Sequence, residues 1–183
     1  LVSMNAYGSW FLFPDLALKS IASYLFRRNL IQGTNNTSTS TGPVFVQSST
    51  AIYFESNMLV DLNLNGSYGI GLPNIRIPKA LITNNTFFNI TGPAISSITR
   101  DTIISVSQNV VVRTYCHESI IGIESTSDYP VNVSSNIIAL SYLQDIYQST
   151  KYGALFLQMR LQENSQLNII DNILTMIQMG NVL

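Results

Sequence analysis

The ten carboxylates of this 183-residue chain are the first residues to consider as catalysts or metal ligands. Most stand alone in the sequence, and the densest group is Glu118, Glu124 and Asp128, close to His117 and Arg113. Hydrolysis of a glycosidic bond needs two carboxyl groups across that bond, and calcium needs several oxygen ligands at one place. Because no paired-acid motif is present, the sequence predicts no catalytic residue, no cofactor and no metal site.

Cys116 and His117 are adjacent and supply at most half of a metal site. The chain has one cysteine and one histidine, so no second pair exists to complete it. A lone Cys-His pair is typical of a structural position, and one cysteine cannot form a disulfide framework. Nucleophilic catalysis by Cys116 would need an orienting partner, which the spacing does not identify.

Asn-x-Ser/Thr patterns are the most frequent candidate modification sites. They are a mild excess over the number expected by chance in a chain this rich in Asn, Ser and Thr, and most lie in expected turns, where a glycan can project. Asn132 lies between two valines, and strand alternation points its side chain outward. The candidate glycosylation sites are Asn35, Asn36, Asn65, Asn84, Asn89 and Asn132. The alternative is an unmodified neutral surface.

The composition limits the classes of protein. Charged residues make up 10% of the chain, against about 25% in an average globular domain. The nine basic residues are balanced by ten acidic residues, so the chain has no excess of positive charge with which to bind nucleic acid. No apolar run approaches the ~20 residues of a membrane span. The apolar share of 46% is enough for one domain with a core.

An internal repeat organises the chain. Asparagine recurs directly before short apolar segments, at intervals of 28, 28, 24, 27 and 36 residues. A glycine usually followed by a second apolar segment lies between successive asparagines, and a third apolar segment leads to the next asparagine. Three short strands that recur in one direction favour a solenoid with equivalent strands stacked in parallel. The repeated asparagines are Asn29, Asn57, Asn85, Asn109, Asn136 and Asn172.

Two physical reasons place asparagine at the repeated corner. Asparagine tolerates the left-handed backbone conformation that a sharp corner needs. Stacked asparagine side chains can also hydrogen-bond amide to amide along the solenoid axis. The sequence therefore predicts an Asn ladder, with Val111, Ile104, Ile138, Leu155 and Ile169 facing inward.

The run from Ala80 to Ser96 (ALITNNTFFNITGPAIS) resembles one coil of the right-handed parallel β-helix superfamily, which includes pectin lyase-like proteins and many surface adhesins. It is also similar, more distantly, to repeats of polymorphic outer-membrane adhesins. The resemblance covers roughly residues 29–180. It implies an all-β right-handed parallel β-helix of about six coils. It says little about activity, because this fold carries many unrelated functions.

Two segments leave alternatives open. Residues 15–28 have an acidic start, a basic end and apolar residues at helical spacing, so they form either a capping helix or another coil. Residues 166–179 fit either a helix or strands, and their isoleucines and Asn172 favour strands. We therefore divide the chain into residues 1–28, an N-terminal cap or first coil, and residues 29–183, the β-helix coils.

These patterns favour an extracellular or cell-surface structural protein, a segment of a fibre, adhesin or appendage. We expect it to meet other copies, or other segments of the same assembly, through the solenoid ends, with glycans as a further partner and no role for nucleic acid. One alternative is a carbohydrate-active or carbohydrate-binding β-helix, which needs acids stacked on one exposed sheet. Another is a viral fibre or tail protein on a virion surface.

Overall fold

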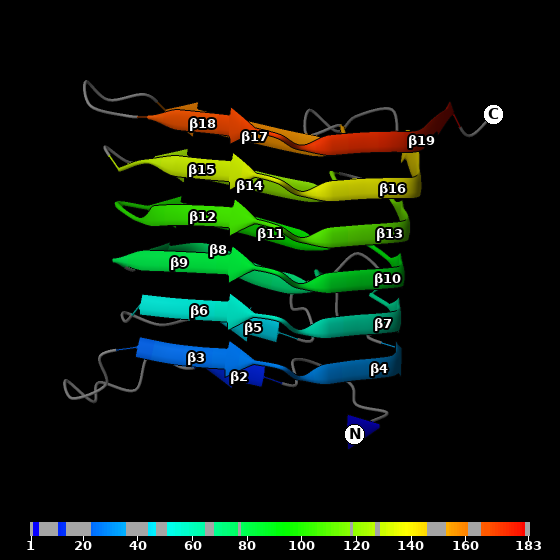
Figure 1. Cartoon of the computed structure of the whole chain (residues 1–183), viewed down its shortest axis with the longest axis horizontal. Coiled ribbons are helices and arrows are strands. Elements are labelled where there is room, and N and C mark those ends of the chain that lie inside the picture. The colour runs from blue at the N-terminus through cyan, green and yellow to red at the C-terminus, as the bar shows by residue number, and fades with distance from the viewer. Residues whose placement is uncertain are drawn as a thin grey trace.

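The computed structural model describes residues 2–3, 11–13, 23–35, 44–46, 51–64, 68–76, 78–117, 119–126, 129–145, 153–160 and 166–181. These residues form strands, turns and short links, and no helix occurs among them. The strands lie in three sheets stacked along one axis, so the described part is a parallel β-solenoid (Figure 1). The predicted all-β fold of stacked parallel strands is confirmed.

Each sheet contains strands that are far apart in sequence, and every neighbouring pair is parallel. Sheet A has the order β1 (Val2–Ser3), β4 (Leu30–Asn35), β7 (Met58–Asn63), β10 (Thr86–Thr91), β13 (Val110–Cys116), β16 (Ile137–Asp145) and β19 (Ile173–Asn181). Sheet B has the order β2 (Phe11–Phe13), β5 (Val44–Val46), β8 (Ile70–Arg76), β11 (Ile95–Arg100), β14 (Ile121–Thr126) and β17 (Leu155–Arg160). Sheet C has the order β3 (Ser23–Arg27), β6 (Ala51–Glu55), β9 (Lys79–Thr83), β12 (Ile103–Ser107), β15 (Val131–Ser134) and β18 (Leu167–Ile170).

The chain visits the sheets in a fixed order, B then C then A, as in β8, β9 and β10. The sequence predicts about six coils. Among the described residues, sheet A contains seven strands and sheets B and C contain six each. Between sheets C and A the corner is always two residues, one after the strand of sheet C and then the repeated asparagine. The links from A to B and from B to C differ in length from one circuit to the next.

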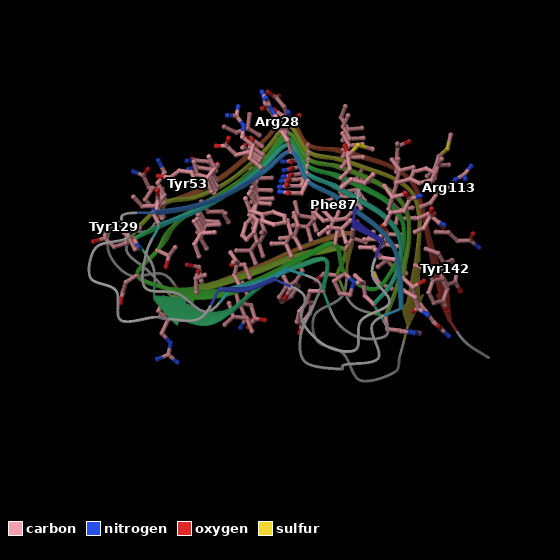
Figure 2. All side chains as sticks on the ribbon, turned by 90° about the horizontal axis from the view of Figure 1, so that it is seen from below. Arg28, Tyr53, Phe87, Arg113, Tyr129 and Tyr142 are labelled. Carbon is pink, nitrogen blue, oxygen red and sulfur yellow. The ribbon has the colours of Figure 1, made fainter. Side chains whose placement is uncertain are left out.

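The core consists of columns of apolar side chains that face inward at equivalent strand positions. One column in sheet A runs in register through Ile31, Leu59, Phe87, Val111 and Ile138, all buried. Figure 2, a view along the solenoid axis, shows Phe87 pointing into this interior. The strands alternate buried and less buried residues, as a sheet with one face on a core should.

The predicted inward residues follow this register. Val111, Ile104 and Ile138 are buried, which confirms the prediction for the middle of the solenoid. Leu155 is partly buried against the core. Ile169 stands in register with the buried Val133, but it is 53% exposed because it lies in β18, the last strand of sheet C.

The backbone reason given for the repeated asparagine is wrong. The residue before each asparagine, not the asparagine itself, has the left-handed conformation, with φ from 54° to 57°. That residue makes the corner, which leaves the asparagine free to turn its amide along the axis. The corner residues are Arg28, Ser56, Asn84, Gln108, Ser135 and Asp171. Figure 2 shows Arg28 at this corner.

The two ambiguous segments contain strands. Ser23–Arg27 is strand β3, so a capping helix does not extend through this part, and residues 15–22 lie outside the described residues. Residues 167–170 and 173–181 are strands β18 and β19, as preferred for that segment.

Glycine has a steric role where the chain enters sheet B. A Cβ atom on Gly69 would lie 2.6 Å from the carbonyl oxygen of Ala94 in the next coil. Because real Cβ atoms do not approach an oxygen so closely, any larger residue would push the two coils apart. The glycine landmark between successive asparagines therefore marks a close approach at this position.

The core also contains a hydroxyl without a partner, and this gives a stability prediction. Thr114 is 2% exposed, and its Oγ1 has no hydrogen bond among the described residues. Thr114→Val removes the hydroxyl and keeps the shape, so we expect the free energy of unfolding to rise by about 1 kcal/mol. Urea unfolding followed by circular dichroism measures this change.

The control for that prediction is Thr102→Val. Thr102 is fully buried too, but its Oγ1 donates to the carbonyl oxygen of Arg100 at 2.8 Å. Removing that hydroxyl leaves a carbonyl with one bond fewer, so this variant should be destabilised. Equal effects of the two substitutions would contradict the prediction.

Candidate functional site

The Asn ladder runs along the corner between sheets C and A. From Asn57 onward, the Oδ1 of each ladder asparagine accepts two hydrogen bonds from the preceding ladder residue, one from its backbone N–H and one from its Nδ2. For Asn85, both donors belong to Asn57, at 3.0 and 2.9 Å. For Asn109, both belong to Asn85, each at 3.0 Å. The same pair of bonds joins the other neighbours from Asn29 to Asn172, which confirms the predicted ladder.

The second Nδ2 proton of each ladder residue goes to a backbone carbonyl. Asn85 donates to the carbonyl oxygen of Phe54 at 3.0 Å, and Asn109 donates to that of Ile82 at 2.9 Å. The amides inside the ladder thus use both protons and both acceptor directions. Since Asn57, Asn85, Asn109 and Asn136 are at most 2% exposed, this full pairing removes the cost of burying them.

All ladder amides point the same way, so the two ends of the ladder are chemically different. Each Oδ1 accepts from the coil before it, whereas each backbone N–H and one proton of each Nδ2 are directed to the coil after it. Among the described residues, the Oδ1 of Asn29 accepts no hydrogen bond and the backbone N–H of Asn172 donates none. The ladder therefore has an acceptor end at Asn29 and a donor end at Asn172.

The end residues compensate with local bonds. The Nδ2 of Asn172 donates to the carbonyl of its own neighbour Ile170 at 3.2 Å, where an interior asparagine would donate to the next ladder residue. The Nδ2 of Asn29 still donates to Asn57, and its second proton goes to the carbonyl of Arg27 at 3.1 Å, where an interior asparagine would donate to a carbonyl of the preceding coil. Both positions thus hold a substitute bond that another coil could replace.

The C-terminal end of the solenoid exposes the core. β17, β18 and β19 are the last strands of the three sheets, at the top of Figure 1. Leu174 continues the column of Phe87 and Ile138 and is 50% exposed, although those two residues are almost fully buried. We call this surface the C-terminal end face. Its exposed core-column residues are Leu167, Ile169 and Leu174. Ile170, Ile173 and Met176 are exposed in the same coil, at positions that also face outward in earlier coils.

The N-terminal side is better covered. Ile31 is 2% exposed and Phe26 is 9% exposed, and these residues stand in the same columns as Leu174 and Ile169. Strand β1 lies beside β4 there, but it pairs through two residues only, Val2 with Ile31 and Ser3 with Gln32. The two ends therefore differ both in cover and in the polarity of the ladder.

Only part of the group of acids singled out in the sequence lies among the described residues. Arg113 lies in sheet A with its guanidinium 5.4 Å from the centre of the Phe88 ring, and exposed His117 packs edge-on against Tyr115. Glu124 lies in sheet B, whereas Glu118 and Asp128 lie outside the described residues. Within the described ranges, no three His, Cys, Asp or Glu side chains come close enough to hold a metal ion.

The candidate glycosylation sites fall into different environments. Asn84 and Asn89 are exposed and have a left-handed backbone, and their amides bond Ser56 and Asp61 at 3.1 and 2.7 Å. Asn132 accepts a bond from Asn168 on the outer face of sheet C. Asn36 and Asn65 lie outside the described residues, as does the side chain of Asn35.

Some contacts were missed in the sequence because they depend on register between coils. The rings of Tyr115 and Tyr142 are stacked with centroids 5.2 Å apart and 8° between their planes. These tyrosines stand in paired positions of β13 and β16, on the outer face that Figure 2 shows for Tyr142. The spacing of 27 residues from Asn109 to Asn136 is the sequence feature that indicates this contact, because Tyr115 and Tyr142 have the same spacing.

Cys116 is buried and has no disulfide.

No family model, no curated protein and no solved structure matches this chain. A search of the described residues finds no helix with the length and hydropathy needed to cross a membrane.

Proposed function

We propose that this chain is a structural segment of an extracellular fibre, adhesin or surface appendage, and that it joins other copies, or other segments of the same assembly, through its solenoid ends. The observation that carries the proposal is the C-terminal end face. Core columns that are buried inside the solenoid become half exposed there, next to strands whose outer edge pairs with no other described strand. Apolar patches and open strand edges mark surfaces that other chains cover.

The chemistry of the end face supports assembly. From residue 166 to residue 178 the only charged residue is Asp171, so little electrostatic repulsion opposes contact between two ends. A low share of charge over the whole chain and the Asn-x-Ser/Thr patterns favour the extracellular location and the glycans of the proposal. Membership of the right-handed β-helix superfamily remains part of the same proposal.

Sedimentation of the full chain over a range of concentrations tests this function. We expect concentration-dependent association, and we expect Ile169→Lys to abolish it, because the lysine charge would be placed in the middle of the end face. Met58→Lys is the matched control, since Met58 is 49% exposed on β7, away from the end face. That variant should associate like the unmodified chain.

Two outcomes would contradict the proposal. One is a monomer at every concentration, with the C-terminal strands protected from hydrogen exchange. The other is association that both lysine variants weaken equally, because the contact would then not be made by the end face.

A further inference from the structure

Three buried hydroxyls lie together on the inner face of sheet B. Ser97 and Thr99 belong to β11 and Ser125 belongs to β14, and each residue is at most 2% exposed. Their hydroxyl oxygens have no hydrogen-bond partner among the described residues. A hydroxyl has one donor and two acceptor positions, and leaving these unpaired inside a core costs free energy. Because buried polar groups are nearly always paired, this cluster needs partners of a polar kind.

The register of sheet B sets the spacing within this cluster. Thr99 and Ser125 occupy paired positions of neighbouring parallel strands. Equivalent atoms of such a pair lie ~4.8 Å apart, which is too far for a direct O–H···O bond of ~2.8 Å. Two such bonds from one water molecule, at its tetrahedral angle, span about 4.6 Å. The spacing of the two hydroxyls is therefore that of a water bridge.

The hydroxyl residues are also smaller than their neighbours in the same column. Ser97 pairs with Leu72 in β8 and with Ile123 in β14, and both of these side chains are larger than serine. Hydrogen bonds along the sheet fix the separation of the coils, so the neighbours cannot close over the serine. Ser97 and Thr99 face the same side of β11, ~6.6 Å apart along the strand. Water is held inside a protein where a site is polar and roomy, and this face of sheet B offers both conditions.

The pairing of β8 with β11 is irregular at the same place. Leu72 pairs with Ser97 and Ile75 pairs with Thr99, so two residues of β8 stand opposite one residue of β11. Pro73 is one of these two, and proline has no N–H to give to the sheet. A bulge interrupts the ladder locally and leaves backbone groups without their usual partners. Backbone groups at this bulge add to the polar atoms that can bind water.

We infer that ordered water occupies the inner face of sheet B at β11 and β14, where one molecule bridges Thr99 and Ser125 and a second, bonded to the first, reaches Ser97. This inference does not depend on the proposed assembly. β11 lies between β8 and β14, and β14 lies between β11 and β17, so the site belongs to the middle of the solenoid. The water fills the place that larger apolar side chains fill elsewhere in the same columns.

Thr114 provides the comparison, because its unpaired hydroxyl stands alone in sheet A. Its paired neighbour Ile90 has no polar side-chain group. The hydroxyl of Ser141 accepts from the Thr114 N–H at 3.2 Å and donates its own proton to the carbonyl of Ala139 at 2.9 Å. A buried water needs about two to four partners, and no second unpaired hydroxyl is paired in register with Thr114. We therefore expect no water at Thr114.

Urea unfolding of full-chain variants tests the site. Thr99→Val and Ser125→Ala each remove a partner of the bridging water, so each should lower the urea midpoint. Thr114→Val is the matched control and should raise it. Thr99→Val combined with Ser125→Ala should lower the midpoint by less than the sum of the single effects, because both substitutions disrupt the same water. A midpoint that Thr99→Val raises as Thr114→Val does would overturn the inference, as would strictly additive effects of the two substitutions.

High-resolution diffraction from the unmodified chain tests the site even if a variant fails to fold. We expect a water peak ~2.8 Å from the hydroxyl oxygens of both Thr99 and Ser125, and none beside the hydroxyl of Thr114. A direct bond between the Thr99 and Ser125 hydroxyls, or apolar atoms packed against both of them without water, would overturn the inference.

Discussion

Asn109→Ala should lower the free energy of unfolding by about 3 kcal/mol, because it leaves several buried polar groups unpaired at once. The backbone N–H and Nδ2 of Asn85 lose their common acceptor, and the carbonyl of Ile82 loses a donor. Asn109 is fully buried, so water cannot replace these bonds without entering the core. Chemical denaturation with two independent probes measures the change and tests whether unfolding stays cooperative.

Two other asparagines provide the comparison. Asn132→Ala removes an amide on the outer face, where water can pair with Asn168 instead, and should change stability by less than about 0.5 kcal/mol. Asn172→Ala removes the last ladder residue, whose neighbours are partly exposed, and should fall between the two. Equal losses at all three positions would show that the ladder is no more important than an ordinary surface amide.

Phe87→Ala should cost about 4 kcal/mol, in the range found for removal of a buried aromatic ring. Phe87 is fully buried in the middle of the solenoid, between Leu59 and Val111 in the same column. The neighbouring coils cannot close the space, because their separation is fixed by hydrogen bonds along all three sheets. Thermal and urea unfolding of the variant measure the loss.

Leu174→Ala is the matched control, since Leu174 belongs to the same column but lies half exposed in β19. Its truncation opens no closed cavity, so we expect a loss of no more than about 1 kcal/mol in the monomer. A cost equal to that of Phe87→Ala would mean that the end face is covered in solution. That result would be expected only at concentrations where copies associate.

The repeat can be recognised in the sequence because equivalent positions of successive coils recur at similar intervals along a solenoid. Asn57, Asn85 and Asn109 each precede an apolar strand, and this pattern predicts both the parallel stacking and the ladder. The alternation around Ile104 and Val111 was enough to place them inside. Local sequence carries this information because each coil makes the same contacts as the coil before it.

Other features could not be predicted, because they depend on atoms rather than on spacing. The sequence predicts the left-handed backbone conformation at the repeated asparagine. In the structure it is found one residue earlier, at Ser56 before Asn57 and at Gln108 before Asn109. An isolated serine or glutamine gives no sign of this conformation, which the tight two-residue corner imposes at these two positions. The exposure of Ile169 was also missed, since the pattern treats the last coil like an interior one.

The constant two-residue corner between sheets C and A has a consequence for how such a chain can vary. Any insertion there would take an asparagine out of line and break two bonds on either side of it. The links from A to B and from B to C carry no such constraint, and their lengths already differ between circuits. Lengthening a flexible loop costs only about 0.6 kcal/mol for each doubling. Changes in chain length are therefore tolerated at two corners of the solenoid and excluded at the third, so that one edge is kept constant while the other two are open to new loops.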